Sequence, residues 1–230
     1  MHLPTTTTIL TPLLFSIAPG TAYSIPSRPL PASLSSLSWR DTAPASLPHI
    51  SSISYSGTGC PVTNPQVIRT GAGYGDMGFE LSGFQATLQA ADPTTSTSNC
   101  EVHINSAGGC TAGWQAGIKG VTVAGHLVLD PGAEMDWYLS VFWSADASDT
   151  STISGTIVNN GSTRLDEDIS VTGTTGDIVW SPCAAADGAL GILNADFVVA
   201  LNAPGSQYAF FGKDADTTAD ETWDVVWRQC

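Results

Sequence analysis

The chain has 230 residues, of which 12% are charged, and a formal net charge of −14 at pH 7. A chain this acidic is repelled by phosphate backbones and by anionic membrane surfaces, so we expect neither nucleic acid nor a membrane as a partner. Threonine, serine, glycine, alanine and valine are frequent in the rest of the sequence, and this composition favours short strands and turns over helices.

The N-terminus is predicted to be a secretory signal peptide covering residues 1–22. Residues 9–18 (ILTPLLFSIA) form an apolar core, and the small residues Gly20 and Ala22 favour cleavage after Ala22. The apolar run is too short to span a bilayer, and prolines within and after it disfavour the alternative of a buried helix. We therefore expect a secreted protein, extracellular or associated with the cell wall.

Residues 23–49 are rich in proline and serine and show neither a strand period nor a helix period. This composition predicts a linker or a pro-segment. The pattern changes at residue 50, so we expect the folded domain to cover residues 50–230.

The first predicted strands are residues 52–57, where apolar residues alternate with serines, and residues 77–90 (MGFELSGFQATLQA). In the second segment the apolar parity switches at Ser82 and Gly83. This switch predicts a β-bulge that keeps both halves facing inward.

Residues 121–130 and 135–143 place apolar residues at every second position and are joined by the turn sequence DPGA, so they are predicted to form a hairpin. Further strands are predicted at 99–105, 152–158, 165–172, 177–180, 190–202 and 222–229. A total of about nine or ten strands separated by turn residues predicts an all-β fold, an antiparallel β-sandwich or jelly roll.

The five cysteines of an exported chain are expected to form disulfides, and an odd count leaves one over. Residues 178–183 (IVWSPC) and 225–230 (VVWRQC) end in the same way, as two neighbouring strands with bridged ends would. We therefore predict the pairs Cys183–Cys230 and Cys60–Cys100, with Cys110 unpaired, although the count leaves other arrangements open.

Four segments in this order, SYSGTGCP (54–61), SNC (98–100), VWSPC (179–183) and WRQC (227–230), resemble a family of small secreted proteins found in filamentous fungi and in bacteria. The family is known as domain of unknown function four-three-six-zero. The resemblance covers about residues 50 to 230 and implies a secreted β domain cross-linked by cysteines. It implies no reaction, substrate or active site, and the SAGGCTAGW segment around Cys110 departs from the family pattern.

The sequon Asn160-Gly161-Ser162 lies in a turn-like stretch and predicts N-glycosylation of Asn160 at the surface of an exported chain.

Neither HExxH nor GxSxG occurs, and we predict no catalytic residue. His126 is expected on the solvent side of its strand. Cys100, His103, Cys110 and His126 are suitable zinc ligands by type but not by spacing. We therefore predict neither a metal site nor a cofactor.

Residues 214–224 (DADTTADETWD) form an acidic stretch whose carboxylates could hold Ca²⁺. The candidate ligands are Asp214, Asp216, Asp220 and Glu221. Because the glycine that an EF-hand requires is missing, a solvated acidic loop is the favoured interpretation.

Trp114 lies in the glycine-rich segment GGCTAGWQAG and is a candidate loop platform on which a sugar ring could stack, although folding back to cap the sandwich is the favoured interpretation. The strand parities of Trp137, Trp143, Trp180, Trp223 and Trp227 predict core positions.

A rigid exported scaffold with glycine-rich loops and no recognisable catalytic set predicts a non-enzymatic binding or surface protein. Its target would be cell-wall polysaccharide or a host component. One alternative is a secreted glycan hydrolase with paired carboxylates among Asp136, Asp177 and Asp196. The other is a structural component of the cell wall.

Overall fold

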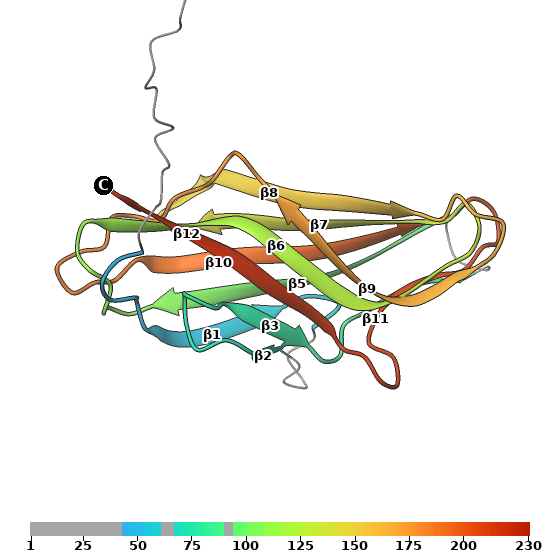
Figure 1. Ribbon diagram of the computed structural model, residues 1–230, viewed down its shortest axis with the longest axis horizontal. Helices are drawn as coiled ribbons and strands as arrows, with labels where there is room; N and C mark the ends of the chain where they lie inside the picture. Colours follow the sequence, from blue (N-terminus) through green and yellow to red (C-terminus); the bar gives the residue numbers. More distant parts are fainter. Residues whose placement is uncertain (1–42, 61–66, 90–93) are drawn as a thin grey trace, which may run out of the picture. The chain divides into compact units, whose positions relative to one another are not determined.

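The computed structural model of the chain describes residues 43–60, 67–89 and 94–230 (Figure 1). The expected signal peptide and most of the expected linker lie outside these residues. The described chain forms the strands β1 to β12 and no helix, so it offers no helix that could cross a membrane. The strands form two antiparallel sheets that pack as a β-sandwich, as the sequence predicts.

The first sheet has five strands in the order β1-β5-β10-β7-β8. Their bounds are β1 (Ile50–Ser56), β5 (Thr95–Ser106), β10 (Gly191–Asn202), β7 (Glu134–Trp143) and β8 (Asp146–Val158). In β7 the residues at odd positions from Met135 to Trp143 are buried, while those between them are partly or fully exposed. This period of two fixes the register, because a slip by one residue would turn the apolar face to water.

The second sheet runs β2-β3-β12-β6-β11-β4, and β9 also pairs with β6. Its strands are β2 (Val67–Arg69), β3 (Gly78–Leu81), β12 (Ala219–Gln229), β6 (Trp114–Leu129), β11 (Ala209–Gly212), β4 (Gln85–Leu88) and β9 (Leu165–Thr174). Since β9 pairs along one edge of β6, both β12 and β11 must lie along the other edge. β11 and β12 therefore follow one another beside β6 as a single strand that residues 213–218 interrupt.

The predicted bulge at Ser82 and Gly83 is instead a tight turn between β3 and β4, closed by the Phe84 N–H donating to the Leu81 carbonyl at 2.9 Å. β3 pairs with β12 and β4 pairs with β11. The turn between β3 and β4 therefore lies beside the interruption between β11 and β12. The apolar residues on both sides of the turn are buried, as the parity switch predicts.

The predicted hairpin between residues 121–130 and 135–143 is wrong. The first segment belongs to β6 of the second sheet, and the second is β7 of the first sheet. The DPGA turn therefore carries the chain from one sheet to the other, and each strand buries its apolar face against the opposite layer.

Trp137 fills the interior between β8 and β9. A Cβ atom added at Gly155 or at Gly173 would lie 2.8 or 2.5 Å from its indole ring. The two glycines, one on a strand of each sheet, therefore leave the room that this large side chain needs.

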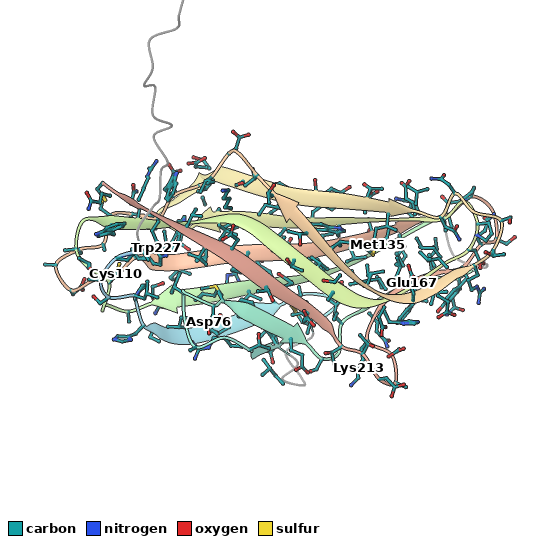
Figure 2. The ribbon with its side chains drawn as sticks, in the orientation of Figure 1. Asp76, Cys110, Met135, Glu167, Lys213 and Trp227 are labelled. Carbon is teal, nitrogen blue, oxygen red and sulfur yellow. A yellow bond between two sulfur atoms is a disulfide. The ribbon has the colours of Figure 1, made fainter. Side chains whose placement is uncertain are left out.

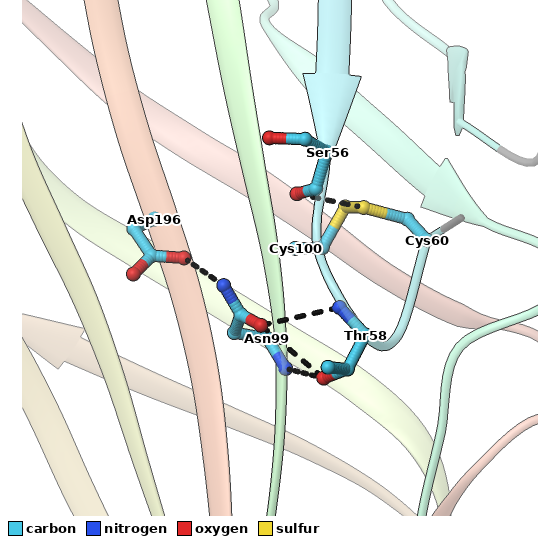
Figure 3. The surroundings of a disulfide bond; sticks show 6 residues. All are labelled: Ser56, Thr58, Cys60, Asn99, Cys100 and Asp196. Carbon is cyan, nitrogen blue, oxygen red and sulfur yellow. Dashed lines mark hydrogen bonds between the residues drawn. A yellow bond between two sulfur atoms is a disulfide. The ribbon is translucent and has the colours of Figure 1, made fainter. Parts of the chain in front are cut away.

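Two disulfides join Cys60 to Cys100 and Cys183 to Cys230, which is the pairing that the sequence predicts. Figure 3 shows the first, beside Asn99, whose side chain accepts hydrogen bonds from Thr58 and donates one to Asp196 at 3.2 Å. This bridge links β5 to the chain that leaves β1.

The similar endings of the two segments predicted that the second disulfide joins neighbouring strands, and this prediction is wrong. Gly117 of β6 pairs with Val226 on one side and with Trp180 on the other, so β6 lies between the two bridged segments. Next to the bridge, the Gly113 carbonyl accepts from the N–H of Cys230, and the Gly113 N–H donates to Ala184. The bridge thus fastens both flanking segments around the start of β6.

Residues 44–49, which the sequence assigns to the linker, pack against the sandwich. Pro44 and Pro48 are buried, and Leu47 contacts the core. The His49 N–H donates to the Gly108 carbonyl at 2.9 Å. The packed chain therefore begins before residue 50.

Candidate functional site

Two adjoining hollows, of about 460 and 210 Å³, lie between the start of β8 and the segment that follows β9. Both are lined by Asp149, Val179 and Trp180. We call them together the Trp180 groove, whose walls come from residues 143–150 and 176–182. The groove combines an aromatic side chain with carboxylates.

Trp180 does not occupy the core position that its sequence parity predicts. It is half-buried and forms an isolated bridge with Gly117 rather than part of a strand. A Cβ at Gly117 would come within 2.3 Å of Ile178 Cγ2 and 3.3 Å of Trp180 Cε3. The missing side chain therefore allows this wall of the groove to lie directly against β6.

Arg228 of β12 holds the indole in place. Its Cζ atom lies 4.3 Å from the centroid of the Trp180 ring, within range of a cation–π interaction. Its Nε–H donates to Gln115 Oε1 at 2.8 Å, and Gln115 Nε2 in turn donates to the Ser181 carbonyl. Arg228 and Ser181 are thus both hydrogen-bonded to the side chain of Gln115 in β6.

The backbone of the same wall is also fixed. The Ser181 N–H donates to the Ala116 carbonyl at 2.8 Å, and Ser181 Oγ accepts from the Ala116 N–H at 3.0 Å. Two residues later, Cys183 enters its disulfide with Cys230. The Trp180 ring is therefore oriented before any ligand arrives.

The carboxylates of Asp149 and Asp177 line the larger hollow, and neither has a hydrogen bond or ion-pair partner among the described residues. Asp146 lines the smaller hollow and accepts a hydrogen bond from Ser148 Oγ at 2.7 Å. No lysine or arginine lines either hollow. The groove can therefore accept hydrogen bonds and attract positive charge.

Trp143 forms part of the wall of the smaller hollow and is 2% exposed. Its Nε1–H has no acceptor among the described residues. A buried donor without an acceptor costs free energy, so an oxygen atom of a ligand would improve this position.

Trp114, the candidate loop platform, is the first residue of β6 and packs half-buried against the core. Its carbonyl accepts from the Ala184 N–H at 2.7 Å. Trp114 therefore packs against the sandwich, as the favoured interpretation predicts, and Trp180 lines the groove instead. The sequence does contain a signal that Trp180 lies outside a regular strand. This signal is Pro182, two residues after Trp180, because proline has no N–H to donate to a strand ladder.

A second polar cluster surrounds His126 on the outer side of β6. Its Nδ1 lies 3.0 Å from Asp168 and 3.4 Å from Asp214, while Nε2 lies 3.1 Å from Asp166. Partial burial lowers the pKa of His126, but the hydrogen bond that Asp168 accepts from the ring and the charges of the aspartates outweigh this and raise the pKa above its ordinary value.

Donor atoms of His126, Asp168 and Asp214 lie within 4.8 Å of one another, so the cluster has ligand types that could hold a divalent cation in place of a proton. The sequence did not reveal this cluster, because its members come from β6, β9 and the loop 213–218. Figure 2 labels Lys213, where this loop starts.

The acidic residues that were considered as candidate calcium ligands lie in different environments. Asp214 Oδ1 accepts the N–H groups of Asp216 and Thr217, both at 2.8 Å, and this turn lowers the pKa of Asp214. Asp220 and Glu221 belong to β12 and point to opposite faces. The four carboxylates therefore do not share one face.

Glu221 lies inside the sandwich, is 3% exposed, and accepts a hydrogen bond from Trp223 Nε1 at 2.8 Å. Burial outweighs this hydrogen bond and raises the pKa of Glu221 to about 7.

Cys110 is buried and unpaired, as the sequence predicts, and burial raises the pKa of its thiol. Asn160 is exposed in the turn between β8 and β9, where it is open to modification. Its neighbour Asn159 is buried and donates to the Leu129 carbonyl at 2.7 Å, which fixes this turn.

The carboxylates considered for a hydrolase are not paired. Asp136 lies opposite Ala200 and Asp196 opposite Ser140, and this four-residue offset corresponds to about 13 Å along the strands. Glycosidase carboxylates stand about 5–9.5 Å apart. Asp177, expected in a strand, lies outside the strands and lines the Trp180 groove instead.

A family model described as Domain of unknown function (DUF4360) matches residues 47–230. The chain belongs to this family. The matched range begins within the packed segment that precedes β1, so the DUF4360 domain includes both disulfides and the Trp180 groove. A search of curated proteins found no match to the sequence.

Two solved structures show similarity to the DUF4360 chain. One is the carbohydrate-binding module TmCBM61 in complex with β-1,4-galactotriose, with 10% identity, coverage of 79% of this chain and 91% of that chain, and a TM-score of 0.22. The other comes from work on the promiscuous specificity of carbohydrate-binding modules from the β-sandwich superfamily, with 9% identity, coverage of 77% and 57%, and a TM-score of 0.24. Scores this low carry no inference about the groove.

Proposed function

We propose that this DUF4360 chain is a secreted, non-enzymatic polysaccharide-binding protein and that the Trp180 groove is its binding site. The observation that carries the proposal is an indole lining a groove while Arg228 holds its orientation. The apolar face of a sugar ring stacks on an aromatic face of this kind. The aspartates around it accept hydrogen bonds from sugar hydroxyls.

The fixed geometry of the groove supports this role. Ligands lose less free energy to ordering when the binding residues already hold their bound positions. Gln115, Ser181 and the Cys183–Cys230 disulfide hold the Trp180 wall against β6. Two disulfides also suit an oxidising extracellular compartment.

The test is retention of the secreted protein on a panel of insoluble polysaccharides. We expect Trp180→Ala to weaken retention by about tenfold, through loss of stacking area, while the thermal midpoint stays close to that of the wild type. Trp114→Ala is the matched control, because Trp114 is also half-buried but lies outside the groove. Retention that depends on Trp114 and not on Trp180, or no retention on any polysaccharide, would contradict the proposal.

A glycan hydrolase is the second candidate function, because Asp149 and Asp177 both line the larger hollow. A hydrolase needs one carboxyl group as acid and a second as base or nucleophile. Reducing-sugar release from the retained polysaccharides distinguishes the two functions. Release that is abolished in Asp149→Ala or Asp177→Asn would favour the hydrolase over the binding protein.

A further inference from the structure

We infer that the Trp180 groove selects a polysaccharide with free amino groups, a polymer of de-N-acetylated hexosamine, over neutral and acidic polysaccharides. This inference rests on the proposed function and names the ligand class of the same groove.

The first argument is the charge that the groove leaves uncompensated. Three carboxylates line it, those of Asp146, Asp149 and Asp177. Within the described residues, the carboxylates of Asp149 and Asp177 have no polar partner, and no lysine or arginine contributes to the walls. Charge complementarity of this kind sets specificity, because a ligand of the wrong sign is repelled.

The nearby cation Arg228 carries one positive charge and can offset only one of the three carboxylate charges. Arg228 lies over the Trp180 ring and donates to Gln115, and it is absent from the walls of both hollows. An ammonium group of the ligand would donate three hydrogen bonds, whereas carboxylates only accept them. A neutral sugar offers hydroxyl donors without the charge, and a uronate polymer places like charge against the aspartates.

The second argument is the indole of Trp143 in the wall of the smaller hollow. Its Nε1–H is buried and has no acceptor among the described residues, although buried polar groups are normally hydrogen-bonded. A sugar supplies hydroxyl and ring oxygens as acceptors. The wall of the smaller hollow therefore includes a residue whose buried donor has no acceptor in the described chain, beside carboxylates that lack donors.

The experiment compares retention on four insoluble polysaccharides at low and high salt. They are a glucosamine polymer, its fully N-acetylated form, a neutral glucan and a cross-linked polygalacturonate. We expect retention on the glucosamine polymer to exceed that on the N-acetylated form by about tenfold and to fall as salt screens the charges. Polygalacturonate should retain least.

The decisive variant is the double substitution Asp149→Ala and Asp177→Asn, in which alanine at 149 avoids a new glycosylation sequon with Thr150 and Ser151. It should lower retention on the glucosamine polymer by about tenfold and remove the salt dependence, with little effect on the N-acetylated polymer. The matched control is Glu167→Gln with Asp216→Ala, which removes the same charge from exposed positions outside the groove. The control should bind as the wild type does.

The outcomes separate the inference from the proposed function. Equal, salt-insensitive retention on both glucosamine polymers, lost in Trp180→Ala, would overturn the amino-sugar inference and leave polysaccharide binding intact. The amino-sugar inference would also be overturned if the control variant loses as much retention on the glucosamine polymer as the groove variant does. The net charge of the protein would then explain the preference. If none of the four polymers nor any other polysaccharide retains the protein, the proposed function fails and the inference with it.

Discussion

The guanidinium of Arg228 lies 4.3 Å from the centroid of the Trp180 ring, although the two residues belong to segments on opposite edges of β6. The contact passes over Gly117, which has no side chain to separate them. The position of the indole therefore depends on β6, on β12 and on the segment after β9 together.

We predict that Arg228→Ala weakens polysaccharide retention by about threefold to tenfold, because the indole loses the cation that fixes its orientation. The free energy of unfolding should fall by less than about 1 kcal/mol, since Arg228 is exposed. Arg228→Lys should recover part of the retention, because it keeps the charge but loses the planar contact with Gln115. A binding isotherm and a denaturant titration of each variant measure both quantities, and unchanged binding by Arg228→Ala would contradict the prediction.

Gly117→Ala should disturb the groove more than the core. The new Cβ would lie 2.3 Å from Ile178 Cγ2, so the segment carrying Trp180 must move away from β6. We expect a clear loss of polysaccharide retention with a loss of stability of about 1–3 kcal/mol, measured by denaturant unfolding. Gly73→Ala is the control, because a Cβ there meets nothing within 4 Å and Gly73 lies outside the groove. Wild-type retention by Gly117→Ala would show that the wall does not need this close approach.

Glu221→Gln should change how stability depends on pH. The folded pKa of Glu221 is about 7 and its ordinary value is 4.5, so the folded chain keeps a proton that the unfolded chain releases between these values. The free energy of unfolding of the wild type therefore falls as pH rises through this window, by about 3 kcal/mol in total, and stays lower above it.

Glutamine remains neutral at all pH values and can still accept the hydrogen bond from Trp223 Nε1. Glu221→Gln should therefore be close to neutral at pH 4.5 and more stable than the wild type at pH 8. Denaturant titrations from pH 4 to pH 9 measure the difference, with Asp216→Ala as an exposed control. Parallel curves for wild type and Glu221→Gln would contradict the burial of an ionisable carboxyl at this position.

The cysteines allow a chemical test of the connectivity. Replacing Cys183 and Cys230 together by serine opens a loop of 47 residues and should lower the free energy of unfolding by about 4 kcal/mol on the chain-entropy model. In the unreduced wild type, a thiol reagent should label Cys110 only after unfolding, because its thiol is buried and the other four cysteines are bridged. Mass spectrometry of the labelled peptides decides this, and a labelled Cys230 would contradict the structure.

The sequence predicted the features that depend on local patterns. Alternation in residues 135–143 identified a strand with one buried face, and the repeated ending of the segments at Cys183 and Cys230 identified a bridged pair. It could not assign strands to sheets, because a short turn such as DPGA can connect strands of one sheet or of two. Register with β10 and with β12 decides this, and those partners lie far along the chain.

The groove was harder to predict, because its residues are brought together by pairing across β6. The parity of Trp180 predicted a core position, but parity applies only within a strand, and this residue forms an isolated bridge before Pro182. Trp114 was predicted to lie in a loop because glycines precede it, yet pairing with Gln229 makes it the start of β6. The cluster at His126 likewise depends on three distant segments.

The different burial of the indoles gives the domain a spectroscopic probe of its own groove. Trp137, Trp143, Trp223 and Trp227 are at most 4% exposed, while Trp180 is half-buried in the groove wall. In a background with Trp39→Phe and Trp114→Phe, a soluble quencher should reach the emission of Trp180 in preference to that of the four buried indoles. A bound oligosaccharide would shield this fluorophore, so occupancy of the groove could be followed without an added label.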